Sequence, residues 1–444
     1  MSDPAAPDPL PLTRDRSFWS LLATQFLGAF NDNFYKQFVL LLGIAYVDAE
    51  DLKSDPFQTA AVVAFALPFI LLSLYTGSVA DRYSKRTIIV LCKVLEIVVM
   101  LAATAVLLVL EAGTSTLIWA SIAVVALMSL QSTLFGPSKY GVLPELFRSG
   151  DLPRVNGAVQ MTTFFAILLG MVAAGVLLEQ LAGRLWLFGL AAVTVAVVGT
   201  ATSLGVRPLP AANPGQRFEW ASMIGDPAVW RLIAGDRELR MATLVYSLFF
   251  LLGALLQLAI NGFGVNQMGY SLSRTSVLVM MLTLGMGIGC SLAGQLSRDR
   301  NRPELVAYGS IGLLLTGLPA GLAPDLLPRG AIFGAECVLL VLLGTAAGLT
   351  AVPLQVTLQT KPPRAVKGRV IGVVNFCTWV GVLGGGLLYF ALSGLLRDAA
   401  GNSRIGYTFA LVGLLMLPAV AIYRPRGGAT PIRDQPRRDQ PIRD

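Results

Sequence analysis

The chain has 444 residues, of which 55% are hydrophobic and only 14% charged, and its mean hydropathy is +0.67. Soluble domains carry roughly 25% charged residues, so this composition excludes an ordinary soluble protein and favours a membrane protein. The formal net charge is +8, but the basic residues lie in short segments between long apolar runs. That distribution is typical of membrane topology signals, and we expect no nucleic-acid partner.

The chain has few side chains that could serve in catalysis or bind a metal. Histidine is absent, which excludes Ser–His triads, histidine-ligated metals and histidine proton relays. The cysteines lie within apolar stretches without CxxC spacing, and we interpret them as small hydrophobic residues. They are Cys92, Cys290, Cys337 and Cys377. We therefore expect a membrane transporter without cofactor or metal, and not an enzyme.

Twelve apolar runs are long enough to cross a bilayer core, which takes about 20 helical residues. They cover residues 18–46, 58–80, 86–110, 115–135, 155–180, 184–206, 241–263, 274–296, 304–322, 331–358, 368–393 and 404–423. Residues 1–17 lack the pattern of a cleaved signal peptide, so we expect a cytoplasmic tail and a retained first helix. The polar segment 207–240 divides the chain into six-helix halves, 18–206 and 241–423, and the tail 424–444 is expected to be disordered.

The distribution of charge predicts the topology. Most of the 34 Lys and Arg residues fall in segments that the twelve spans place on one side of the membrane. By the positive-inside rule, this side is the cytoplasm, and both termini lie there.

An internal repeat supports the two halves. Arg154, Val155, Gly157 and Gly170 recur at one offset as Arg369, Val370, Gly372 and Gly385, and Gly28-Ala29 recurs as Gly253-Ala254. Parallel repeats of six helices around a central cavity are typical of the major facilitator architecture, which is the all-α membrane fold that we expect.

The loop after the second span reads GSVADRYSKR and resembles the major facilitator signature G-x-x-x-D-[RK]-x-G-x-[RK]-[RK], with Ser where the family prefers Gly. A small residue allows close helix contact, and the aspartate can meet a helix N-terminus in the other half. This interpretation predicts a gate built from Gly77, Asp81, Arg82, Lys85 and Arg86. The alternative is a plain positive-inside loop.

The first span contains an unusual number of polar residues. Amides and charged groups deep in a membrane helix are costly unless they face a cavity or a partner. Asp32 and Lys36 share one helical face with Gln25, and Asn31 and Asn33 flank the aspartate. We predict that these residues bind substrate. The alternative is a local i,i+4 ion pair between Asp32 and Lys36 that only permits insertion.

Further polar residues follow in later spans. Under the repeat, Gln257 corresponds to Asp32 and Asn261 to Lys36, as expected for a site between the halves. Lys93 and Glu96 stand at i,i+3, where a local pair and a substrate-binding role are equally good interpretations. The substrate-binding candidates of the fifth and eleventh spans are Asn156, Gln160 and Asn375.

Two charged residues have open roles. Lys139 follows a Gly-Pro break beside Tyr140, and either an interfacial anchor or a gate fits it. Glu336 in the tenth span has no partner in the sequence and would need one.

Four stretches carry a family resemblance. QFLGAFNDNFYK, FGPSKYGVLPEL, RVNGAVQMTTFFAILLG and VPLQVTLQTKPPRAVKGRVIG resemble the lysophospholipid transporter (LplT-type) branch of the major facilitators, across residues 18–423. The branch includes the transporter half of acyl-glycerophosphoethanolamine acyltransferase fusions. The resemblance implies inward movement of lysophospholipids across the bacterial inner membrane for re-acylation, with Asp32 as the headgroup-binding carboxylate.

The chain departs from this branch in two ways. Gln257 stands where the branch offers an arginine, so Lys36, Lys93 or Lys139 would supply the positive charge for a phosphate. The sequence shows no fused acyltransferase, so we expect a separate one as partner, beside membrane lipids. A proton-coupled exporter of drugs or small metabolites, with Asp32 as its protonation site, is the alternative function. A membrane scaffold or integral enzyme is a third class, and the lack of nucleophile–base spacing disfavours the enzyme.

Overall fold

The computed structural model describes residues 11–45, 55–110, 114–181, 183–215, 225–297, 300–399 and 401–423. This part of the chain is almost entirely helical. Its N-terminal half comprises α1 (Arg16–Ala45), α2 (Asp55–Arg82), α3 (Lys85–Val109), α4 (Ser115–Gly141), the short α5 (Leu143–Leu146), α6 (Leu152–Gln180) and α7 (Trp186–Ser203). The C-terminal half comprises α8 (Pro227–Gly235), α9 (Arg237–Gly262), α10 (Leu272–Leu296), α11 (Glu304–Leu326), α12 (Arg329–Thr360), α13 (Lys367–Leu395) and α14 (Tyr407–Ile422).

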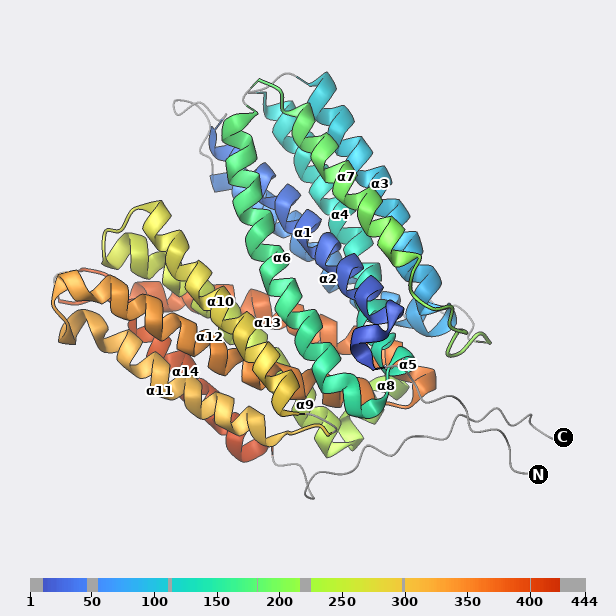
Figure 1. The fold of residues 1–444 in the computed structure, drawn as a ribbon. Coiled ribbons are helices and arrows are strands. Elements are labelled where there is room, and N and C mark those ends of the chain that lie inside the picture. The colour runs from blue at the N-terminus through green and yellow to red at the C-terminus, as the bar shows by residue number, and fades with distance from the viewer. Residues whose placement is uncertain are drawn as a thin grey trace.

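The expected all-α membrane fold is confirmed. Twelve of the helices within the described ranges are long, and ten of them are long and apolar enough to cross a membrane. The other two are α1, which has a polar centre, and α14, which has 16 residues. Figure 1 shows two bundles that meet near α5 and α8 and diverge toward their opposite ends.

The repeat seen in the sequence corresponds to equivalent packing within each bundle. Gly170 lets α6 approach α1, since a Cβ there would lie 2.6 Å from the carbonyl oxygen of Phe30. Gly385 lets α13 approach α9 in the same way, against the carbonyl of Leu251. Glycine at matched positions therefore brings equivalent helices close in both halves.

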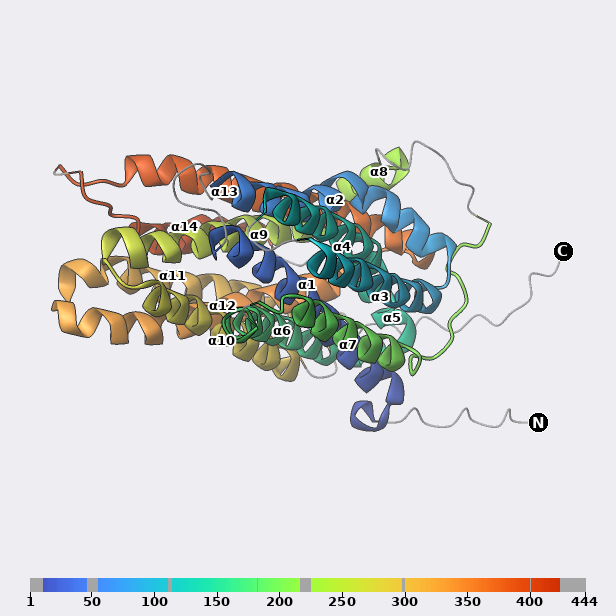
Figure 2. The same cartoon turned by 90° about the horizontal axis from the view of Figure 1, so that it is seen from above.

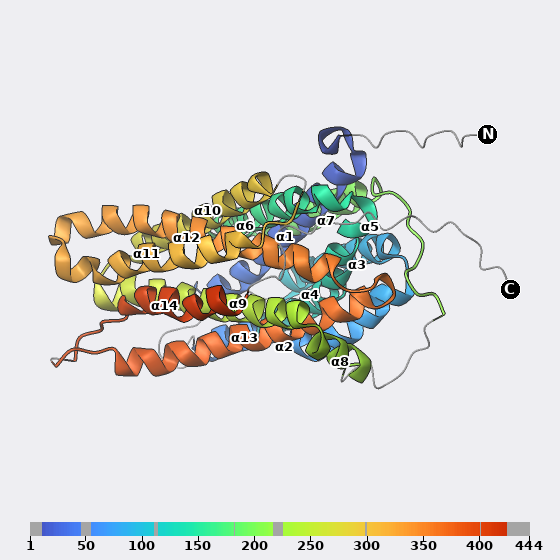
Figure 3. The same ribbon diagram turned by 90° about the horizontal axis from the view of Figure 1, so that it is seen from below.

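The contact between the bundles repeats as well. In the views from above and below, α2 lies beside α13 and α6 beside α10, and these pairs are in contact (Figures 2 and 3). Gly157 of α6 faces the carbonyl of Cys290, and Gly372 of α13 faces the carbonyl of Ser73. A Cβ at Gly157 would lie 2.6 Å from its facing oxygen, and one at Gly372 would lie 2.5 Å away. Two symmetry-related crossings thus join the halves.

The segment between the halves contains a helix that the sequence analysis did not predict. The segment expected as the linker 207–240 includes α8, and α9 already begins at Arg237. Asp226 caps α8 by accepting from the backbone N–H of Ala228, and Pro227 occupies its first position. Val229 and Ile233 pack into the core of the C-terminal bundle, so α8 is docked on that half. Residues 424–444, expected to be a disordered tail, lie outside the described residues, as do residues 1–10 of the expected N-terminal tail.

Candidate functional site

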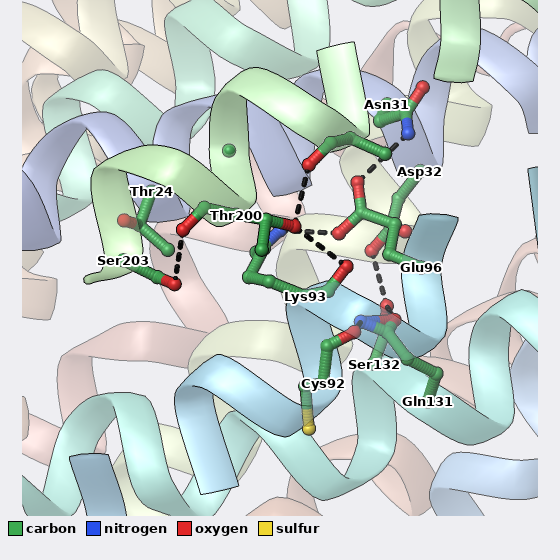
Figure 4. A network of polar contacts seen from close by, with 12 residues as sticks. Thr24, Asn31, Asp32, Cys92, Lys93, Glu96, Gln131, Ser132, Thr200 and Ser203 are labelled. Atoms are coloured by element: carbon green, nitrogen blue, oxygen red, sulfur yellow. Dashed lines mark hydrogen bonds and ion pairs between the residues drawn. The ribbon is translucent and has the colours of Figure 1, made fainter. Parts of the chain in front are cut away.

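The polar centre of α1 brings several predicted residues together with α3 and α4 (Figure 4). Asp32 is half-buried, and its carboxylate accepts a hydrogen bond of 2.6 Å from the Ser132 hydroxyl of α4. Electrostatic interactions link this carboxylate to Lys36, Lys93 and Glu96. The Asp32 carboxyl group is therefore partly accessible within the N-terminal bundle.

Lys93 and Glu96 form an ion pair that is closed to solvent, with side chains only 1% and 2% exposed. Asn31 donates to Glu96 Oε1 at 2.8 Å and to the carbonyl of Ala192 at 3.3 Å. A Cβ at Gly28 would collide with the Lys93 ammonium, so Gly28 makes room for it. The buried ion pair favours the structural interpretation of Lys93 and Glu96, which Asn31 supports through its Nδ2 group, while Asn31 Oδ1 has no partner among the described residues.

Lys36 points elsewhere. Its ammonium lies 4.5 Å from the ring centroid of Phe65 on α2, and the side chain is half-buried. Across the charged side chains that the structure describes, no ion pair joins Lys36 to Asp32. The local i,i+4 ion pair is therefore not formed in this conformation, in which Asp32 contacts Ser132 and Lys36 contacts Phe65.

The remaining amides of α1 have partners within the bundle. Gln25 is buried and exchanges hydrogen bonds with Thr162 and Thr163 of α6, at 2.5 and 2.7 Å. Asn33 donates to the carbonyl of Ala29 at 2.8 Å. These contacts attach α1 to α6 and stabilise its own backbone, rather than surrounding Asp32.

The second-half candidates lie apart from this cluster. Gln257 and Asn261 are exposed on the same face of α9 as Gly253. A Cβ added at Gly253 would have no neighbour within 4 Å, so no other helix packs at that point of the face. Asn375 of α13 is half-buried, and its amide nitrogen would lie 3.3 Å from a Cβ at Gly136 of α4. The structure thus leaves the polar face of α9 uncovered and places Asn375 where α13 crosses α4.

Asp81 is the centre of the contact between α2 and α13. Its side chain is fully buried, and its two oxygens accept from the backbone N–H groups of Gly368 at 2.6 Å and Arg369 at 3.0 Å. These donors belong to the first turn of α13, where free N–H groups and the helix dipole favour an anion. Gly77 lies one turn away against the carbonyl of Gly368. The loop signature thus joins the two halves.

The basic residues of the loop differ in surroundings. Lys85 forms a buried ion pair of 2.7 Å with Glu145 of α5. Arg82 stacks instead on the ring of Tyr83, with its guanidinium carbon 5.3 Å from the ring centroid. Lys139, near the end of α4, stacks in the same way on Tyr140, with its ammonium 4.6 Å from the ring centroid. Arg86 has a buried Nε without a partner among the described side chains. The ring contact of Lys139 favours its anchor interpretation.

A second polar contact between the halves was not predicted from the sequence. Asn156 of α6 and Gln359 of α12 exchange two amide hydrogen bonds, of 2.8 and 2.9 Å, and both side chains are fully buried. Gln160, one turn along α6, is buried with an Nε2 that has no partner in the described part of the chain. Asn156 therefore joins the two halves near their meeting end. The sequence signal for this contact is weak: Gln359 is an amide within an apolar span, and its partner Asn156 is 203 residues away.

The linker also reaches this contact. Arg369 approaches Asp81 at 3.4 Å and forms an ion pair of 2.5 Å with Asp226, the residue that caps α8. The backbone N–H of Asn213 donates to the carbonyl of Asp81 at 2.8 Å. Sequence reasoning missed Asp226, although the cap motif Asp-Pro marks it.

Aromatic rings continue the crossing toward the middle of the molecule. Trp379 of α13 stacks on Phe69 of α2 with centroids 4.4 Å apart, and it meets Phe65 edge-on at 6.0 Å. Lys36 lies over that same Phe65. The contacts between the halves therefore extend from Asp81 to Phe65, which Lys36 also contacts. The bundles diverge toward their other ends (Figure 1).

Two parallel six-helix bundles that are tightly joined at one end and diverge at the other, with charged residues between them, define a membrane transporter of the alternating-access type. The comparisons with known proteins give the family. Residues 19–386 match the Major Facilitator Superfamily, and the chain belongs to it.

Curated relatives cover most of the chain. It is 27% identical over 371 residues to the "Lysophospholipid transporter LplT" of Pectobacterium carotovorum subsp. carotovorum (strain PC1), covering 81% of this chain and 82% of the relative. Proteins of the same name from Enterobacter sp. (strain 638) and Escherichia coli O7:K1 (strain IAI39 / ExPEC) are 28% identical, each covering 81% of this chain and 85% of the relative. The family resemblance stated from the sequence is confirmed.

Solved structures share the fold. The human organic anion transporter MFSD10 aligns with a TM-score of 0.74 at 15% identity, covering 93% of this chain and all of that one. A variant of the E. coli fucose:proton symporter FucP aligns with a TM-score of 0.68 at 15% identity, covering 93% of this chain and 100% of that one. At this identity, the likeness concerns the fold alone.

Proposed function

We propose that the protein moves lysophospholipids of the lysophosphatidylethanolamine type across the bacterial inner membrane by alternating access. The observation that carries this proposal is the pair of opposite charges on α1, Asp32 and Lys36, which are half-buried and not paired with each other. Relatives named as lysophospholipid transporters support the choice of substrate. The protein acts as a transporter rather than as an enzyme.

The two charges match the two charges of a zwitterionic headgroup. The Asp32 carboxylate suits the ammonium, and the Lys36 ammonium suits the phosphate, one helical turn away. Lys93 is disfavoured as phosphate ligand because it already forms a buried ion pair with Glu96. Lys139 is disfavoured because it stacks on Tyr140. Of the three lysines that could replace the missing arginine, Lys36 is therefore our choice.

The acyl tail stays in the bilayer in this mechanism. Exposing it to water would cost about 0.8 kcal/mol per CH₂ group, so a path that keeps the tail between helices and lipid is favoured. Gln257 and Asn261, exposed on α9, offer polar contacts to the headgroup from the second half once the bundles close around it.

The distribution of basic residues predicts the orientation of the protein in the membrane. If the basic segments are cytoplasmic, both termini are cytoplasmic, and the end where Asp81 and Asn156 join the halves is the cytoplasmic gate. The structure then represents an outward-open conformation. In this proposal, 1–17 and 424–444 are the tails and 18–206 and 241–423 are the bundles. The segment 207–240 is the connection between them, of which α8 and the start of α9 belong to the C-terminal bundle. A separate acyltransferase would consume the lysophospholipid delivered inside.

The proposal is tested with right-side-out vesicles and labelled lysophosphatidylethanolamine. Asp32→Asn keeps the shape and removes the charge, and losing one charge-assisted contact of about 1.5–3 kcal/mol should reduce inward movement by roughly 10- to 100-fold. Asp325→Asn is the matched control, because Asp325 pairs with Arg404 at the far end of α11. If Asp32→Asn transports lysophosphatidylethanolamine inward as fast as Asp325→Asn and the wild type do, Asp32 is not part of the substrate site.

A further inference from the structure

Glu336 is an acid that the proposed transport site does not use. It lies on α12, eight residues after the capping residue Pro328, and its side chain is 0% exposed. Neither carboxylate oxygen has a hydrogen-bond partner among the described residues. It belongs to the C-terminal bundle, away from Asp32 and Lys36 of the N-terminal one.

The surroundings of Glu336 include no cation that pairs with it among the described residues. Its electrostatic neighbours are the Tyr270 hydroxyl, from the segment before α10, and Cys337 on α12 itself. From α10, Arg274 stacks on Phe333, with its guanidinium carbon 5.8 Å from the ring centroid. From α11, Asp325 pairs with Arg404 at 2.5 Å and accepts a hydrogen bond from Tyr407. Arg274 also interacts with Tyr270, and among the described ion pairs neither Arg274 nor Arg404 pairs with Glu336.

An ionised carboxylate is not stable in such a place. Burying an unpaired charge costs several kcal/mol even after relaxation, which is more than the group can recover without donors. A metal ion is an unsuitable partner, because no group of three or more His, Cys, Asp or Glu side chains gathers here or anywhere else in the part of the chain that the structure covers. A proton needs only one carboxylate oxygen.

We infer that Glu336 is a proton-binding site of the C-terminal bundle, occupied by one proton in this conformation. The proton comes from a hydronium ion of the solvent: one O–H bond of hydronium breaks, one O–H bond forms on a Glu336 carboxylate oxygen, and a water molecule is left. Eight helical residues span about 12 Å, so the acid lies close to the end of α12 at which the bundles diverge.

Tyr270 offers the route to that end. Its hydroxyl is buried, has no partner among the described groups and interacts with Glu336, while the residue as a whole is only half-buried. Its ring meets Phe333 edge-on, with centroids 5.5 Å apart. Movement of this ring pair would open Glu336 to water on the diverging side. Exchange of the proton therefore depends on the conformation of the C-terminal bundle.

Infrared difference spectroscopy of the full chain in lipid nanodiscs tests the inference. At neutral pH the wild type should show the C=O band of a protonated carboxylic acid, shifted in D₂O, and Glu336→Gln should lose it. Glu304→Gln is the matched control, since Glu304 is exposed at the start of α11. An identical acid band in the wild type and in Glu336→Gln would overturn the inference.

A second measurement does not depend on spectral assignment. In weakly buffered solution with a pH-indicator dye, acidification from high pH to neutral pH should load one more proton onto the wild type than onto Glu336→Gln. Equal uptake would contradict the site. Asp32→Asn should leave the Glu336 band in place while it reduces lipid movement, so the proton site and the lipid site fail or succeed separately.

Discussion

Replacing Asp81 by Asn is the most direct test of how the two bundles are held together. The carboxylate accepts from the N–H groups of Gly368 and Arg369, and the Arg369 side chain lies 3.4 Å away. A charge-assisted hydrogen bond contributes about 1.5–3 kcal/mol, and Asn retains one acceptor oxygen. The variant should therefore lose about 1.5–3 kcal/mol of the free energy that favours the joined end.

This loss corresponds to a roughly 10- to 100-fold shift of the equilibrium toward conformations in which α2 and α13 separate. Spin labels on exposed positions at this end, Tyr83 and Arg364, report the separation by pulsed electron resonance. Arg82→Gln is the charge control, because the Arg82 guanidinium stacks on Tyr83 of its own loop rather than on α13; its reporter pair uses Ser84 in place of Tyr83. A distance distribution for Asp81→Asn that matches the wild type would refute this account of the gate.

Three further changes probe the interior. Lys93→Met leaves Glu96 as a lone buried charge and should lower stability by about 3–5 kcal/mol, seen as a lower melting temperature, whereas Lys93→Met with Glu96→Leu should recover most of it; a single variant as stable as the double would contradict the pair. Asn156→Ala leaves the amide of Gln359 buried without a partner, so the equilibrium should shift toward the separated state by about 1–3 kcal/mol, measured by cross-linking. The double variant Asn156→Leu with Gln359→Leu removes both amides and should shift the equilibrium less. Gly157→Val places a side chain against the Cys290 carbonyl and should prevent cross-linking of α6 to α10, while normal cross-linking would show that the two helices accommodate the side chain without separating.

Much of this protein can be predicted from its sequence. The runs of about 20 apolar residues require helices across a membrane, because unpaired backbone groups are not tolerated in hydrocarbon. The repeated glycines at 157 and 372 and at 170 and 385 predict two related halves, and each of them lies at a helix crossing. The signature aspartate, Asp81, predicts a contact with a helix N-terminus, a physical consequence of its charge.

Tertiary structure alone decides what each polar residue does. Helical periodicity shows that Gln25, Asp32 and Lys36 share a face, but it does not show which helix covers that face; α6 covers Gln25 while Asp32 and Lys36 stay half-buried. Asn156 meets a partner 203 residues away, a pairing that no local pattern encodes. The sequence determines the fold because burial follows from local composition, whereas the roles of its polar groups follow from long-range packing.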